Sequence, residues 1–186
     1  VENAFDLLSE LTAANGGTLL PCASDPGARS AAERAPENLA QRPYGDDTGL
    51  NAVVRGIDAL GYHLTLRRCD TFLGDVLVPM YGRHNVLNAL AAYEVGARLG
   101  IEHIVLASGL ATFAGVKRRM ELRGTVNKVV VFDDFAHHPT AVKTTLEGVY
   151  ERHPNQRILA IFEPRSATSC RKVFQAPYEA AFGAAD

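Results

Sequence analysis

Residues 82–88, G-R-H-N-V-L-N, combine side chains that can bind a nucleotide. They lie where a β-rich region ends and a helical pattern begins, and the free N–H groups of a helix N-terminus suit nucleotides and anions. Asn85 and Asn88 are three residues apart, so both carboxamides can point the same way and match the donor and acceptor edge of adenine. The alternative is that His84 and Asn85 only cap the helix, and the spacing leaves both interpretations open.

Residues 132–140, F-D-D-F-A-H-H-P-T, form a second polar segment after a run of β residues. We expect this position to be the carboxyl end of a parallel strand, where open α/β sheets bind ligands. The carboxylate of Asp134 can take ribose hydroxyls or help to hold a metal, and a histidine can bind phosphate, ligate metal or transfer a proton. Adjacent residues of an extended segment point to opposite sides, so at most one of His137 and His138 should face a cleft. The alternatives are that Asp134 caps the turn and that one histidine is packed structurally.

Two further segments carry arginines. In residues 118–121, R-R-M-E, Arg119 lies between two expected domains and can reach a transferring phosphate on closure, although an ion pair with Glu121 is an equal alternative. In residues 162–166, F-E-P-R-S, Arg165 with Ser166 beside it is a candidate for holding a substrate carboxylate. A loop arginine is more often an ordinary surface residue, and that alternative stays open.

Composition excludes several function classes. The 186 residues carry a net charge of −2, and their short basic run at 117–119 is no footprint for nucleic acid. No apolar window is long enough to span a membrane, and three scattered cysteines predict no disulfide framework, so we expect a cytoplasmic protein. There is no phosphate-binding G-x-x-x-x-G-K-[ST] loop. The first residues resemble the middle of a helix, and we interpret the chain as a piece of something longer.

The elements that position these residues follow from apolar periodicity and helix-end signals. We expect helices at about 4–14, 26–34, 84–99, 103–113 and 139–151, and strands at about 18–20, 129–132 and 158–162. Residues 50–79 should form a small antiparallel set of strands, and a last helix should start at Thr168 and be weakened by Pro177. The β–α–β–α order after Gly115 predicts a parallel crossover, hence an α/β fold.

Three segments in this order resemble the Mur ligase family of peptidoglycan synthesis. They are residues 79–92 with G-R-H-N-V-L-N, residues 115–121 with K-R-R-M-E, and residues 131–140 with D-D-F-A-H-H-P-T. The resemblance covers about residues 18–186. It implies that residues 1–117 are the latter part of a central ATP-binding domain and that residues 118–186 begin a Rossmann-like C-terminal domain.

The resemblance also implies an activity for the whole protein. Mur ligases phosphorylate a carboxylate with ATP and Mg2+ and join the acyl phosphate to an amine. R-R-M-E, D-D-F-A-H-H-P-T-A and F-E-P-R-S are most similar to the branch that joins L-alanyl-γ-D-glutamyl-meso-diaminopimelate to UDP-N-acetylmuramate in peptidoglycan recycling. The branch that adds L-alanine is the alternative, and a non-catalytic nucleotide-binding module is another.

The resemblance assigns roles by position. Asn88, with His84 or Asn85, contacts adenine; Asp134 holds the ribose; Arg119 approaches the phosphates. His137 or His138 lies near the incoming amine. The phosphate loop and the metal ligands are expected outside this chain, so the piece alone is expected to be inactive.

Overall fold

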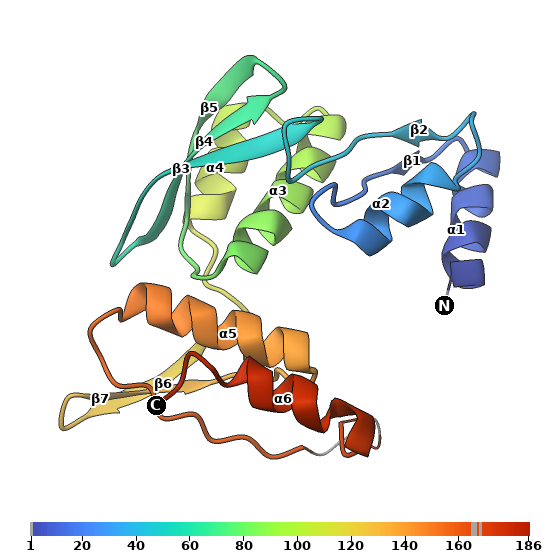
Figure 1. Cartoon of the computed structure of the whole chain (residues 1–186). Coiled ribbons are helices and arrows are strands. Elements are labelled where there is room, and N and C mark those ends of the chain that lie inside the picture. Colours follow the sequence, from blue (N-terminus) through green and yellow to red (C-terminus); the bar gives the residue numbers. More distant parts are fainter. Residues whose placement is uncertain (1, 165–166, 168) are drawn as a thin grey trace. The chain divides into compact units, whose positions relative to one another are not determined.

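The computed structural model describes residues 2–164, 167 and 169–186. The chain divides into two compact units (Figure 1). Unit 1 comprises Val1–Val78 and Asn85–Thr112, and unit 2 comprises Pro79–His84 and Phe113–Asp186. The expected assignment of residues 1–117 and 118–186 to two Mur ligase domains stays a prediction.

Unit 1 begins with helices and short parallel strands. These elements are α1 (Glu2–Ala14), β1 (Thr18–Leu19), α2 (Pro26–Glu33) and β2 (Ala40–Gln41), with β1 pairing parallel to β2. Asp25 caps α2, because its carboxylate accepts a hydrogen bond of 2.7 Å from the Ala28 amide, and Pro26 occupies the first turn. The cap residue and the helix agree with the expectation.

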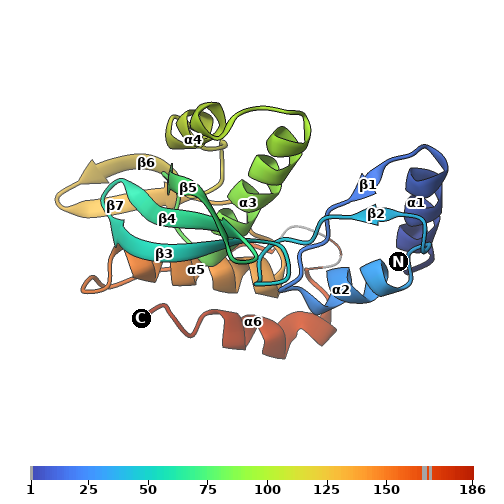
Figure 2. The same ribbon diagram turned by 90° about the horizontal axis from the view of Figure 1, so that it is seen from above.

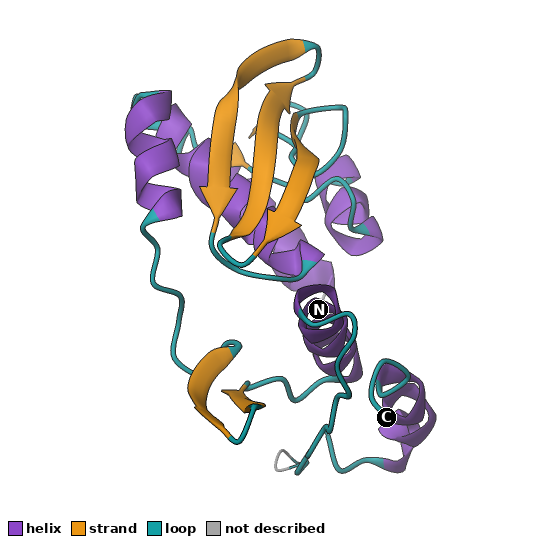
Figure 3. Cartoon of the chain, turned by 90° about the vertical axis from the view of Figure 1, so that its left-hand side faces the viewer, coloured by secondary structure: helices purple, strands orange, loops and turns teal. Residues whose placement is uncertain are grey.

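The rest of unit 1 is an antiparallel sheet with two helices. The strands β3 (Leu50–Asp58), β4 (Gly61–Arg68) and β5 (Thr71–Val78) pair in the order β3-β4-β5, and the helices are α3 (Arg83–Arg98) and α4 (His103–Ala111). Figure 3 shows the three strands side by side with α3 behind them. Glu94 of α3 is buried and ion-paired with Arg68 of β4, which ties the helix to the sheet.

Unit 2 contains a β-hairpin and two helices. They are β6 (Glu121–Val126), β7 (Val129–Asp133), α5 (Pro139–Arg152) and α6 (Gln175–Ala181), preceded by the short 3-10 helix η1 (Lys172–Phe174). The helices α5 and α6 lie next to each other (Figure 2). Val142, Leu146, Ile158 and Ala181 form the buried cluster of this unit.

Two expectations for unit 2 need correction. Residues 158–162 belong to no strand in the part of the chain that the structure describes, and β7 pairs antiparallel with β6, so the predicted parallel crossover is wrong there. The last helix begins at Gln175, which places Pro177 in the first turn, where no backbone N–H is needed. Thr168 lies outside the described residues.

No described helix is both long enough and apolar enough to cross a membrane.

Candidate functional site

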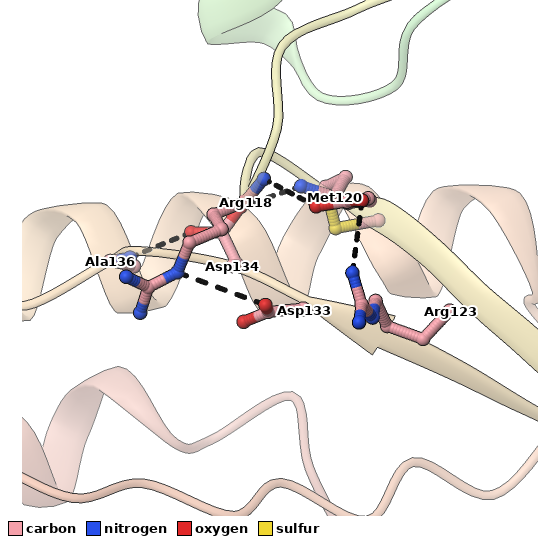
Figure 4. Close-up of polar contacts among 7 residues, drawn as sticks. Arg118, Met120, Arg123, Asp133, Asp134 and Ala136 are labelled. Atoms are coloured by element: carbon pink, nitrogen blue, oxygen red, sulfur yellow. Dashed lines mark hydrogen bonds and ion pairs between the residues drawn. The ribbon is translucent and has the colours of Figure 1, made fainter.

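The Asp134 carboxylate is the centre of a hydrogen-bonded turn at the end of β7 (Figure 4). Its Oδ2 accepts a hydrogen bond of 2.8 Å from the Met120 amide, and its Oδ1 accepts one of 2.8 Å from the Ala136 amide. The Thr145 hydroxyl of α5 donates to Oδ1 at 3.3 Å. Asp134 therefore joins residues 118–120, the end of β7 and α5. A carboxylate has about four acceptor positions, so three donors leave room for one more, such as a ribose hydroxyl.

The turn that Asp134 holds has an unusual backbone. Arg118 and Met120 adopt φ values of +57° and +51°, in the left-handed region that non-glycine residues rarely occupy. The Phe135 amide donates to the Arg118 carbonyl at 2.8 Å, and the Arg118 amide donates to Oε2 of Glu121 at 2.8 Å. Such a conformation persists only where surrounding contacts fix it, and these hydrogen bonds do so.

Arg118 and Arg119 both lie near the ring of Phe135. The guanidinium carbon of Arg118 is 4.8 Å from the ring centroid and that of Arg119 is 6.0 Å from it, which is the outer limit of a cation–π contact. Arg119 is exposed, so it is available to an anion. The carboxylate of Glu121 is paired instead with Arg123, at 3.1 Å. The hydrogen bond from the Arg118 amide is the main cause that lowers the pKa of Glu121, and Arg123 lowers it further.

The two histidines differ in what their side chains do. Nδ1 of His138 accepts a hydrogen bond of 3.4 Å from the Thr140 amide and so caps α5, and its ring meets Phe174 edge-on at 5.5 Å. Nδ1 of His137 lies 3.0 Å from the Phe135 carbonyl, which only accepts, so this nitrogen carries the proton. In the neutral form of this tautomer, Nε2 is the nitrogen that can accept a proton. His138 matches the structural alternative, and His137 is the better candidate for proton transfer.

His84 belongs to unit 2, within the segment Pro79–His84. Its Nδ1 is buried and has no hydrogen-bond partner among the described residues. Burial is the main cause that lowers the pKa of His84; the charge of Asp134 raises it, Arg119 lowers it, and Glu151 raises it. These charge effects place His84 in the same electrostatic neighbourhood as Asp134 and Arg119.

Asn85 and Asn88 lie at the start of α3, in unit 1. Nδ2 of Asn88 donates to Oδ1 of Asn85 at 3.5 Å, so the two carboxamides share one face of the helix, as their spacing predicts. Asn88 is exposed and can present its carboxamide to a ligand.

The predicted substrate-binding residues and a metal site are not found among the described residues. Arg165 and Ser166 lie outside them. The described residues contain no group of three or more His, Cys, Asp or Glu that could hold a metal ion. Asp134 accepts from N–H and O–H donors, and Asp133 has Arg118 at 3.7 Å, so this pair does not fit Mg2+.

The sequence did not indicate the backbone partners of Asp134 or the ring under the two arginines. The Met120 amide, the Ala136 amide and the Phe135 ring are parts of the site that residue types alone do not reveal. An aromatic residue, Phe135, between the Asp-Asp pair and the His-His pair was the available signal.

Comparisons with known proteins relate this chain to ligases. Residues 118–181 match the family described as Mur ligase, glutamate ligase domain. The UDP-N-acetylmuramate–L-alanine ligase of Mycobacterium marinum is 40% identical over 199 residues, which cover 98% of this chain and 39% of that protein. The ligase of the same description from Arthrobacter sp. is 36% identical over 187 residues, covering 100% of this chain and 39% of the relative. The chain thus spans about two fifths of these relatives.

Solved structures show the same fold. A murein peptide ligase from Psychrobacter arcticus is 32% identical with a TM-score of 0.59, covering 91% of this chain and 36% of that one. The UDP-N-acetylmuramate–alanine ligase of Thermotoga maritima has a TM-score of 0.68 at 23% identity, covering 86% and 39%. The chain therefore has a mixed α/β structure that matches the Mur ligase, glutamate ligase domain over residues 118–181 and is similar over nearly its whole length to UDP-N-acetylmuramate–L-alanine ligases.

Proposed function

We propose that this chain is part of an ATP-dependent ligase that joins an amine to the carboxylate of UDP-N-acetylmuramate. ATP transfers its terminal phosphoryl group to the carboxylate, the amine attacks the resulting acyl phosphate, and phosphate leaves as the amide bond forms. The observation that carries the proposal is the similarity of the whole chain to ligases of this description, at 36% and 40% identity. Catalysis of this kind depends on positioning and on charge stabilisation.

The candidate residues receive roles within this proposal. Asn88, with Asn85 or His84, contacts adenine; Asp134 offers its remaining acceptor position to the ribose; Arg119 approaches the phosphates. His137 rather than His138 takes the amine side, because Nδ1 of His138 is used as the cap of α5. Arg165 and Ser166 are proposed for substrate binding, and Mg2+ is assigned to residues outside this chain.

We propose the tripeptide L-alanyl-γ-D-glutamyl-meso-diaminopimelate as the amine donor. The segments F-E-P-R-S and A-H-H-P-T-A support it, as does the similarity to a murein peptide ligase at 32% identity. L-Alanine is the second candidate, because the sequence relatives at 36% and 40% identity are described as L-alanine ligases.

Phosphate release tests both proposals. The complete protein that contains this chain is supplied with ATP, Mg2+ and UDP-N-acetylmuramate, together with the tripeptide, L-alanine or no amine. We expect release only with an amine, and faster release with the tripeptide. Phosphate release at the same rate without any amine would refute ligase activity. Release with L-alanine but not with the tripeptide would identify L-alanine as the donor.

The role of Asp134 has its own test. Asp134→Ala should raise the KM for ATP. The control is Asp133→Ala, because the carboxylate of Asp133 makes a long contact of 3.7 Å with Arg118. An unchanged KM in Asp134→Ala would remove this residue from the nucleotide site.

A further inference from the structure

Gly148 lies in the interior of α5, where glycine disfavours a helix relative to alanine. It is buried, and a Cβ placed on it would lie 3.2 Å from both Cα and N of Gly82 and 3.4 Å from the carbonyl carbon of Tyr81. Those distances are tighter than ordinary contacts, and the neighbours are backbone atoms. A side chain at position 148 would therefore require the backbone at residues 81–82 to move by a few tenths of an ångström, or more for a side chain larger than alanine.

One face of α5 receives this segment. Thr144, Gly148 and Arg152 are spaced by four residues and so share a face of the helix. A Cβ built on Gly82 would be 3.5 Å from the Thr144 carbonyl, and the Arg152 guanidinium carbon lies 4.6 Å from the centre of the Tyr81 ring. We call this face of Thr144, Gly148 and Arg152 the seat.

The other face of α5 packs in the apolar core of unit 2. Val142 and Leu146 lie there in a cluster with Ile158 and Ala181. One face of the helix therefore packs in this core, while the seat contacts the Pro79–His84 segment of the same unit.

The seated segment is shaped by Gly82 and His84. Gly82 has φ +87°, which favours glycine, and a Cβ on it would lie 2.7 Å from Cε1 and 2.9 Å from Nδ1 of His84. The His84 ring thus folds back over Gly82, with its Nδ1 buried and without a partner among the described residues. The chain continues from His84 directly into Asn85, the first of the two asparagines proposed for adenine.

We propose that Gly148 is a positioning residue for nucleotide binding: it lets Tyr81 and Gly82, which lead into His84 and Asn85, rest on α5 within unit 2. The expected effect on ATP affinity rests on the proposed function, whereas the contact of Gly148 with residues 81–82 does not. It predicts that side-chain size at position 148 controls both the environment of His84 and the affinity for ATP.

The first experiment follows the His84 ring by NMR in the 186-residue chain. Burial lowers the pKa of His84, with Asp134 and Glu151 acting against this effect and Arg119 acting with it. Gly148→Val should return the titration of His84 toward the ordinary value of about 6.5. Gly109→Val is the matched control, because Gly109 is also helical but has nothing within 4 Å of its Cβ position. Gly148→Ala, the smaller change, is measured in the same way in case the valine variant does not fold.

An unchanged His84 titration in a folded Gly148 variant would overturn the proposal. So would an equal shift in the Gly109 control. A graded shift from glycine through alanine to valine at position 148 alone would support it.

The second experiment measures ATP-dependent phosphate release by the complete protein. We expect Gly148→Ala to raise the KM for ATP by about tenfold with a smaller change in kcat, since small misplacements of binding groups have large kinetic effects. Gly109→Ala should leave both parameters unchanged, and an unchanged KM in Gly148→Ala would refute the seat's role in binding. If the unmodified protein releases no phosphate, the proposed function fails, whereas the His84 titration still decides whether the seat exists.

Discussion

Removing the Asp134 carboxylate should loosen unit 2 far more than removing its neighbour Asp133. Asp134 accepts two backbone hydrogen bonds of 2.8 Å, and a hydrogen bond to a charged group contributes about 1.5–3 kcal/mol. Asp134 is half-buried and water can partly replace it at the freed amides, so we expect Asp134→Ala to lower the free energy of unfolding by about 2–4 kcal/mol. Asp133 has an exposed ion pair of 3.7 Å with Arg118, of a kind that contributes about 0–1 kcal/mol.

Amide hydrogen exchange gives the sharpest assay, because the chain contains no tryptophan to report on unfolding. Asp134→Ala should speed exchange at the Met120 and Ala136 amides, whereas Asp133→Ala should leave both protected. Asp134→Asn keeps one acceptor oxygen and should therefore preserve only one of the two protections. Equal effects of the two alanine variants, or an unchanged Met120 amide in Asp134→Ala, would refute the idea that this carboxylate holds the 118–120 turn.

Three other predictions follow from buried groups. Burial lowers the pKa of His84 in the folded state, so the unfolded state takes up a proton at higher pH. The free energy of unfolding should therefore fall as the pH drops below about 6.5 and level off below the lowered pKa. His84→Phe should flatten this part of a plot of urea midpoint against pH. Glu94→Gln should cost about 2–4 kcal/mol in urea unfolding by leaving Arg68 unpaired, and the double change Glu94→Leu with Arg68→Met should recover part of it. Gly74→Ala should lower Tm by several degrees in a calorimetric scan, because φ of +145° disfavours a side chain and its Cβ would lie 2.1 Å from Nε2 of His103. An unchanged Tm would contradict both the backbone strain and the clash.

Local signals in the sequence predicted most helices and the antiparallel strands. The Asp25 cap and Pro26 define the start of α2, and Pro139 defines the start of α5, because cap and first-turn preferences act within a few residues. The short glycine-broken runs between residues 50 and 79 became β3, β4 and β5, since strands that follow one another closely pair antiparallel.

The candidate site was less accessible to sequence reasoning. Residue types identified Asp134 as a candidate, and it does follow the end of β7, but that strand is paired antiparallel and not parallel as expected. They did not reveal that its oxygens are shared with the amides of Met120 and Ala136, since any residue supplies an amide. The sequence also did not predict the role of Gly148, because that role depends on the close approach of Gly82, which lies 66 residues earlier in the chain.

Residues 158–162 show why an apolar run does not by itself make a strand. Their exposure alternates as in a strand: Ile158 is 7% exposed, Leu159 74% and Ile161 93%, while Ala160 and Phe162 pack on the apolar cluster of unit 2. At the start of the segment, Ile158 makes two hydrogen bonds with Asp186. The Asp186 carboxylate accepts from the Ile158 amide at 2.7 Å, and the Asp186 amide donates to the Ile158 carbonyl at 3.0 Å. The side-chain alternation is a property of one segment, but a ladder requires a second backbone at about 4.8 Å. The apolar pattern therefore predicts which side chains pack inward, while strand pairing depends on a neighbouring segment that the pattern cannot specify.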